Sequence, residues 1–252
     1  MDDQWAGLTA ALDRATGAGR QVDVWLRDDD AVTTTKALDR LAALARRSAM
    51  PVLLAVIPDP ADRHLARFVD SEPLLTPTQH GFAHVNHAGF LQRACELGLH
   101  RGRETILAEL ALGRDKMAAL FGSRRSDILV PPWNRIAPEL VPALPQLGFG
   151  GLSTYASLHA NSPGLDILNA GLDIIDWRNG RVCQREDKLV SRLAGLIDDG
   201  GPVGILTHHL VHDEAAWLFL DRALDRLAAH PAARFTAADR LRPERGAAAR
   251  AS

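Results

Sequence analysis

The chain has only two cysteines among its 252 residues, and they stand far apart, at Cys95 and Cys183. Closely spaced cysteine pairs are the usual sign of structural metal sites and redox motifs. This spacing excludes a cysteine-based motif of either kind. We expect two reduced thiols in a cytoplasmic protein.

Long runs of positive charge and of apolar residues are also missing. The formal net charge is −2, the pI is about 6.5, and no stripe of Lys and Arg is long enough to follow a phosphate backbone, so we expect no nucleic acid partner. No run approaches the roughly 18 apolar residues of a membrane span. Residues 1–20 open with acids and lack the apolar core of a signal peptide. We expect no membrane partner.

No internal repeat, low-complexity linker or shift in composition divides the chain. A length of 252 residues fits one α/β barrel. We expect a single domain over residues 1–241. The remaining residues, 242–252, are rich in Ala, Arg and Gly and are expected to form a disordered tail.

Strand patterns alternate with helix patterns along the chain. Short β-branched or aliphatic runs predict strands at residues 22–26, 51–57, 74–78, 127–131, 150–155, 172–177 and 202–207. Amphipathic patterns predict helices at residues 34–47, 103–121, 188–196 and 215–227, whereas residues 82–101 are irregular. This order favours parallel strands with helical crossovers, in a β/α barrel or an open doubly wound sheet.

Five polar clusters follow five of the expected strands. They are Arg27-Asp28-Asp29-Asp30, His80-Gly81-Phe82-Ala83-His84, Pro131-Pro132-Trp133-Asn134, Asp173-Ile174-Ile175-Asp176-Trp177 and Ile205-Leu206-Thr207-His208. Each has a structural explanation of its own; the acids, for example, would cap a helix. Because the carboxyl ends of parallel strands share one edge, where β/α folds build their sites, the convergence favours a functional site.

In order and spacing these clusters resemble the motifs of the polysaccharide deacetylases, the NodB-homology proteins of carbohydrate esterase family 4. The resemblance extends from the first expected strand to the last, and the chain is similar to a divergent member. It implies a distorted (β/α)7-type barrel. It also implies a metal-dependent hydrolase that removes an N-acetyl or related acyl group from an amino sugar or glycan fragment by attack of metal-bound water.

The resemblance assigns a role to each matching residue. Asp29 would be the general base and His208 the acid that protonates the leaving amine. The metal ligands would be Asp30, His80 and His84, which leave open positions as in catalytic sites. The expected ion is Zn²⁺, with Co²⁺, Ni²⁺ and Mn²⁺ as alternatives. Further pocket residues are implied: Arg27, Pro132, Trp133 with its backbone N–H on the oxyanion, Asn134, Asp176 orienting a basic partner, and Trp177 beside His208.

One departure from the family pattern concerns the general base. The family's proline-rich turn begins with an arginine that pairs with the base carboxylate, and this chain has Val130 there. Arg27 and Arg135 are the candidates to supply that charge. An altered neighbour would change the pKa of Asp29.

Several alternatives stay open at this point. Any of Asp28, Asp29 and Asp30 could be the metal ligand, although the pattern favours Asp30. In the family pattern the catalytic histidine directly follows a hydrophobic residue. His208 is preferred over His209 as the acid only because Thr207 fits that hydrophobic position better than a histidine would. The substrate could also be a non-sugar amide. A third hypothesis is a carbohydrate-binding protein weakened in catalysis by the change at Val130. The oligomeric state is not determined.

Overall fold

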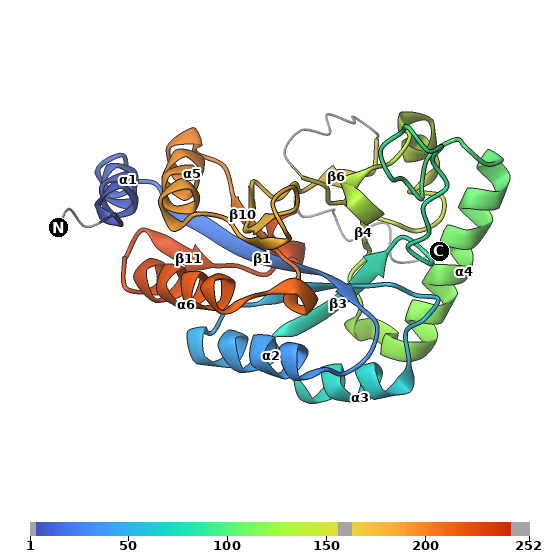
Figure 1. Ribbon diagram of the computed structural model, residues 1–252, viewed down its shortest axis with the longest axis horizontal. Helices are drawn as coiled ribbons and strands as arrows, with labels where there is room; N and C mark the ends of the chain where they lie inside the picture. The colour runs from blue at the N-terminus through green and yellow to red at the C-terminus, as the bar shows by residue number, and fades with distance from the viewer. Residues whose placement is uncertain (1–3, 156–162, 243–252) are drawn as a thin grey trace.

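A curled sheet of parallel strands forms the centre of the computed structural model, which describes residues 4–155 and 163–242 (Figure 1). The strand order is β6-β5-β4-β3-β2-β1-β10-β7, with β11 beside β1. The strands are β1 Val22–Ala31, β2 Val52–Val56, β3 Leu75–His80, β4 Ile128–Val130, β5 Gly151–Leu152, β6 Asp166–Ile167, β7 Leu172–Asp173, β10 Val203–Thr207 and β11 Ala233–Phe235. All pairings in this sheet are parallel, as the order of strands and helices predicts.

Helices cover the outside of the sheet. They are α1 Ala6–Gly17, α2 Lys36–Ser48, α3 Arg63–Ser71, α4 Arg103–Phe121, α5 Glu186–Asp199 and α6 Glu214–Ala228, with short 3₁₀ helices at Gly122–Arg124, Pro132–Asn134, Pro138–Ala143, His209–Val211 and Ala238–Leu241. The amphipathic patterns predict α2, α4, α5 and α6, and the structure agrees. Helices α1 and α3 were not expected. Helix α3 has only nine residues, too few for its apolar stripe to stand out from the neighbouring loops.

The two faces of β1 belong to different clusters of buried side chains. Val24 and Leu26 pack in the main core, which also includes residues of the outer helices. Trp25 packs instead with Leu53 and Leu206 in a smaller cluster on the inner face. Because side chains alternate along a strand, the next inward positions after Trp25 are 27 and 29. The fold thus directs two charged residues of β1 toward the inside of the barrel.

Two expected strands are much shorter than the sequence indicates. The strand expected at 172–177 breaks after Asp173, whose Oδ1 accepts the N–H of Ile175 at 3.0 Å. The chain then forms β8, Ile175–Asp176, which pairs antiparallel with β9, Val182–Cys183, in a separate small sheet. The strand expected at 150–155 is likewise confined to β5. A polar side chain that bonds to the backbone nearby interrupts a strand in a way that propensity does not predict.

Arg242, the first residue of the expected tail, is held by acidic side chains. Arg242 forms ion pairs with Asp127 and with Asp166, whose Oδ2 lies 3.1 Å from its Nε, so this residue is fixed to the sheet edge. The other tail residues, 243–252, lie outside the described part of the chain. Among the residues that are described, no helix has the length and apolar character needed to span a membrane.

Candidate functional site

A pocket of about 1030 Å³ opens at the carboxyl ends of the parallel strands. Its lining includes eight residues named from the sequence: Asp29, Asp30, His80, His84, Trp133, Asn134, Trp177 and His208. It also contains Arg93, Arg135, Thr154, Tyr155, Asp173, Arg178 and Arg181. The polar clusters therefore converge in space. Three sequence-predicted residues, Arg27, Pro132 and Asp176, are not in the lining.

Asp29 and Asp30 are adjacent in sequence, yet both line the pocket. On a regular strand they would point to opposite faces. The pairing of β1 with β2 shifts register between Asp28 and Ala31, and Asp30 has a left-handed backbone, with φ of 74°. Such an irregularity can re-aim a side chain. Here it places consecutive carboxylates on the same side.

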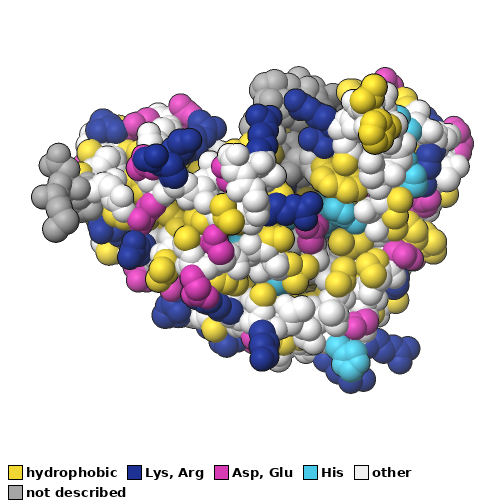
Figure 2. All heavy atoms as spheres, in the orientation of Figure 1, with side chains coloured by type: hydrophobic (Ala, Val, Ile, Leu, Met, Phe, Trp, Pro, Cys, Tyr) yellow, Lys and Arg dark blue, Asp and Glu magenta, His cyan; other side chains and the backbone are white. Residues whose placement is uncertain are grey.

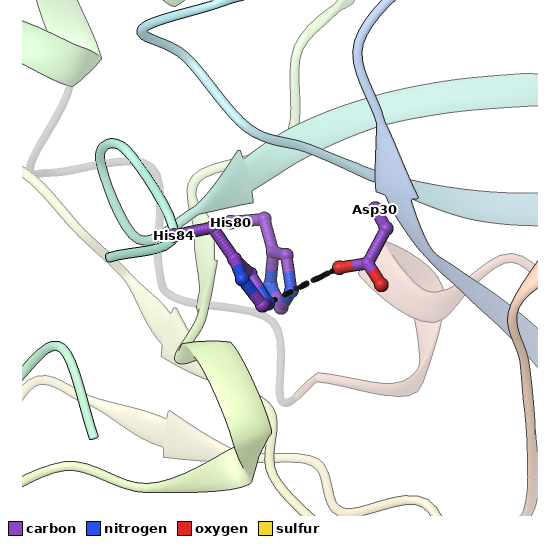
Figure 3. Close-up of side chains that lie close together, drawn as sticks. All are labelled: Asp30, His80 and His84. Atoms are coloured by element: carbon purple, nitrogen blue, oxygen red, sulfur yellow. Dashed lines mark ion pairs between the residues drawn. The ribbon is translucent and has the colours of Figure 1, made fainter. Parts of the chain in front are cut away.

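Asp30, His80 and His84 come together at one wall of the pocket (Figure 3). Oδ1 of Asp30 lies 3.1 Å from Nε2 of His80 and 3.3 Å from Nε2 of His84. His80 is the last residue of β3. His84 is not on a helix, as an HxxxH spacing would allow, but in the following loop with a left-handed backbone. Two imidazoles and one carboxylate form a donor set that suits Zn²⁺ and related divalent ions.

The surroundings of these three residues fit a metal. Nδ1 of His80 lies 2.9 Å from the carbonyl oxygen of Val130, which favours the tautomer that leaves Nε2 free to bind a cation. Burial and the positive charge of His80 lower the pKa of His84, so its ring is neutral near pH 7. Burial by itself would raise the pKa of Asp30, but His80, together with His208 and His84, outweighs burial, lowers the pKa and keeps this carboxylate ionised.

The loop between the two histidines is held by Glu96, which sequence reasoning missed. This fully buried carboxylate accepts the backbone N–H groups of Phe82, Ala83 and His84 at 3.1, 2.7 and 3.0 Å. Gly81 is required beside it, because a Cβ at that position would lie 2.0 Å from Oε2 of Glu96. No sequence signal marks Glu96, which stands alone in an irregular segment.

Arg27 supplies the positive charge next to Asp29. Its Nε lies 3.0 Å from Oδ1, and its Nη2 donates to Oδ2 at 3.1 Å, with both side chains buried. Arg135, the other candidate, donates instead to the carbonyl oxygen of Ala94 at 2.7 Å. The contact that Val130 cannot make therefore comes from a different strand. Arg27 lies behind Asp29 rather than in the pocket lining.

The guanidinium of Arg27 is itself fixed by residues of two other segments. Its Nη1 donates to Oγ of Ser153 at 2.8 Å, and its Nη2 donates to Oδ1 of Asn134 at 2.5 Å. Ser153 was not predicted, although it follows β5 directly, where a polar residue at a strand end is a signal. Asn134 was predicted as a pocket residue, and it also links the proline-rich turn to Arg27.

Asp28 points away from the pocket and binds His209. Its Oδ2 accepts the hydroxyl of Thr207 at 2.6 Å and the backbone N–H of His209 at 2.9 Å, while Oδ1 contacts the His209 ring. Burial opposes ionisation of Asp28, but the charge and hydrogen bond of His209, together with His212 and Thr207, outweigh burial and lower the pKa of the carboxyl. Burial by itself would lower the pKa of His209. The charge and hydrogen bond of Asp28, with the charge of Asp30, more than offset this, so the pKa lies above its ordinary value. Neither residue lines the pocket, and Asp28 does not act as a helix cap.

His208 faces the pocket, consistent with its place two residues after the inward Leu206. Its Nε2 lies 3.8 Å from Oδ2 of Asp29. The Trp177 ring meets the His208 ring edge-on, with centroids 4.6 Å apart, and Nε1 of Trp177 donates to Oδ2 of Asp173 at 2.8 Å. Burial raises the pKa of Asp173.

Asp176 does not take the place that the sequence predicted. Its carboxylate accepts the backbone N–H groups of Arg178 and Asn179 at 3.2 and 3.1 Å, in the turn between β8 and β9. The first acid of the same motif, Asp173, lies in the pocket instead. The break after β7 is the reason, since it sends the second acid into a separate hairpin.

The proline-rich turn closes the metal-ligand side of the pocket. Trp133 and Asn134 both have left-handed backbones, with φ of 53° and 57°. The Trp133 ring lies 4.3 Å from that of His84, centroid to centroid. Pro132 is buried behind it, where its ring closely approaches Gly81. The turn thus packs directly against the loop that carries the second histidine.

No family model and no curated protein sequence matches the chain. Solved structures do. One is a crystal structure described as a putative polysaccharide deacetylase from Mycobacterium smegmatis, with 15% identity, 88% of this chain and 89% of that chain covered, and a TM-score of 0.68. Another is a mutant of a family 4 carbohydrate esterase pseudoenzyme with restored activity, with 14% identity, coverage of 88% and 67%, and a TM-score of 0.60.

A third similar structure is a family 4 acetyl xylan esterase from Clostridium thermocellum in complex with a cobalt ion. It has 14% identity, coverage of 87% and 89%, and a TM-score of 0.54. The chain therefore has the fold of the carbohydrate esterase family 4 deacetylases, at low identity. The expected resemblance and the distorted β/α barrel are confirmed at this level.

Proposed function

We propose that the protein is a metal-dependent hydrolase that removes an N-acetyl or related acyl group from an amino sugar or glycan fragment. The observation that carries this proposal is the grouping of Asp30, His80 and His84 in one pocket with Asp29 and His208. Deacetylases and esterases among the similar structures, one of them bound to cobalt, support the reaction class.

The metal would be held by Asp30, His80 and His84. When bound, a Zn²⁺ ion would supply a Lewis acid and lower the pKa of water at the site. The ligand atoms of these three residues lie within 4.8 Å of one another, which is compatible with one shared ion. The donors also accept Co²⁺, Ni²⁺ or Mn²⁺.

Asp29 and His208 would divide the proton transfers. Asp29 is kept in place by Arg27, and as the base it would take the proton of the attacking water. His208 would donate a proton to the departing nitrogen, without which an amine leaves poorly. The distance of 3.8 Å between Nε2 of His208 and Oδ2 of Asp29 leaves both groups facing the same space. The backbone N–H of Trp133 would stabilise the oxyanion.

Two exposed aromatic residues in the lining favour a sugar over a small aliphatic amide. Tyr155 and Trp177 are 38% and 41% exposed, so their rings are accessible to a ligand in the pocket. Flat apolar rings beside polar groups suit the mixed surface of a saccharide.

The test is acetate release from N-acetylated saccharides by wild-type protein and by Asp29→Asn. The substitution keeps the side-chain shape but removes the proton acceptor. Turnover should fall about 10²- to 10⁴-fold while the metal content is unchanged. Metal-loaded wild-type protein that releases no acyl group from any saccharide would refute the proposal and leave a non-sugar amidase or a binding protein as the alternatives. Undiminished activity in Asp29→Asn would assign the base elsewhere.

A further inference from the structure

Four arginines stand in the lining of the pocket, and none has an acidic partner among the described residues. They are Arg93, Arg135, Arg178 and Arg181, contributed by the loop after β3, the proline-rich turn and the turn between β8 and β9. Neighbouring arginines such as Arg185, by contrast, are paired with acids. Within the described ranges, none of the four forms an ion pair. Figure 2 shows Lys and Arg side chains gathered beside the hollow on this face.

The carboxylates of the pocket already interact with other groups of the protein. Asp29 is paired with Arg27, and Asp30 faces His80 and His84. Asp173 accepts two N–H groups, from Ile175 and Trp177. The lining therefore presents positive charge to a ligand, although the whole chain has a formal net charge of −2.

We propose that the substrate carries an anionic group, a carboxylate or a phosphate, close to the acyl amide, and that these arginines bind it. The guanidinium fork matches both oxyanions and is less strongly hydrated than an ammonium. Low-dielectric pocket walls strengthen the attraction between such charges. This inference rests on the proposed function, because it specifies the saccharide that the same site would hydrolyse.

Arg178 and Arg181 are the decisive pair. Both lie in the β8–β9 turn that follows Trp177, whose ring packs against His208, and both side chains are exposed. They would bind the anionic group on the side of the leaving amine, that is, on the sugar. Arg135 is restrained by its bond to Ala94 on the opposite wall.

A kinetic experiment compares three saccharides in the metal-loaded protein: neutral N-acetylglucosamine oligomers, N-acetylmuramic acid with its carboxylate, and N-acetylglucosamine 6-phosphate. The kcat/KM for at least one anionic substrate should exceed that for the neutral one about 10-fold at low salt, and the difference should shrink at about 1 M NaCl, where the screening length is about 3 Å. The double variant Arg178→Gln/Arg181→Gln should reduce the ratio to near one. The matched control is Arg185→Gln, an exposed arginine four positions further along that pairs with Asp187 outside the pocket. It should leave the ratio unchanged.

A binding experiment separates this inference from the proposed function. Muramic acid, glucosamine 6-phosphate and glucosamine are titrated into Asp29→Asn protein, which needs no turnover. Salt-sensitive binding of an anionic sugar, weakened about 10-fold by the double variant, would support the arginine site even if no acetate were ever released. Equal affinity for charged and neutral sugars would overturn it. Equal kcat/KM for both classes would also overturn it and leave the deacetylase proposal standing.

Discussion

Nε of Arg27 lies 3.0 Å from Oδ1 of Asp29, two positions further along the same strand, and both side chains are buried. Two residues on the same face of one strand thus form this ion pair. In the family pattern that the chain resembles, the arginine comes instead from the start of the proline-rich turn. Alternation brings the two side chains to the same face, and Ser153 and Asn134 fix the guanidinium. A change at one position of a site can be compensated from another element when the charge arrives at the same carboxylate.

The Arg27→Met variant should slow catalysis. Without the guanidinium, the Asp29 carboxylate loses the two contacts that orient it, so kcat/KM should fall about 10- to 100-fold, as is typical when a residue behind the site is removed. Breaking a buried pair should also lower the free energy of unfolding by about 3–5 kcal/mol. Arg27→Lys should restore part of both effects. Arg135→Met is the control, and an equal fall of kcat/KM in that variant would contradict the assignment.

The His80→Ala variant should lose tight metal binding. Removing one of three protein ligands should cost more than the 10- to 100-fold typical of changes around a ligand. His87→Ala, a histidine of the same loop outside the pocket lining, should bind as the wild type does. Elemental analysis after dialysis measures the metal content of both variants. Equal metal content in wild type and His80→Ala would refute the ligand assignment.

Acid should weaken metal binding in the wild-type protein. Burial lowers the pKa of His80, but Asp29 and Asp30 raise it further, above its ordinary value. A proton therefore competes with the metal as the pH falls through that raised pKa. Elemental analysis after dialysis at a series of pH values measures this, and metal content that does not fall toward acid pH would contradict it.

Glu96→Ala should weaken metal binding without removing a ligand. Three backbone N–H groups would lose their acceptor, and the loop that places His84 in a left-handed conformation would relax. We expect a loss of about 10- to 100-fold in metal affinity, as for other residues that orient ligands. Glu104→Ala, an exposed acid in the first turn of α4, is the matched control. Unchanged affinity in Glu96→Ala would show that the loop holds itself.

The His208→Ala variant should distinguish substrates by their leaving groups. Metal affinity should be nearly intact, and amide hydrolysis should fall about 10²-fold or more, while an activated ester, whose leaving group needs no proton, is spared. His209→Ala should show no such selectivity, because His209 contacts Asp28 rather than the pocket. An amide-selective loss in His209→Ala alone would exchange the two roles.

The Asp28–His209 pair should make stability depend on pH in metal-free protein. The lowered pKa of Asp28 gives stability that is present above its ordinary pKa of about 4 and is lost as the pH falls through the folded value. The raised pKa of His209 gives stability that is full below about 6.5 and is lost as the pH rises through the folded value. Urea unfolding of wild type and His209→Gln across this range measures it. The difference between them should be largest between these limits, and a constant difference would contradict the pair's role.

The sequence by itself determined the order of the main strands and four of the helices, because periodicity of buried side chains depends mainly on local pattern. It also located the site, since the carboxyl ends of parallel strands must share an edge. Leu206 and His208 were grouped by alternation, and the structure places Leu206 in the inner cluster and His208 in the pocket.

Only the tertiary structure decided which neighbours of the same type face the pocket. Asp30 reaches it through a register shift and a left-handed residue, which no propensity predicts. The strand break at Asp173 sends Asp176 into a turn, and Glu96 reaches the histidine loop from a segment without any pattern. The packing of three segments around one buried guanidinium places Arg27, and not Arg135, beside Asp29. Such choices depend on contacts between residues distant in sequence, whose energies do not appear in any local window.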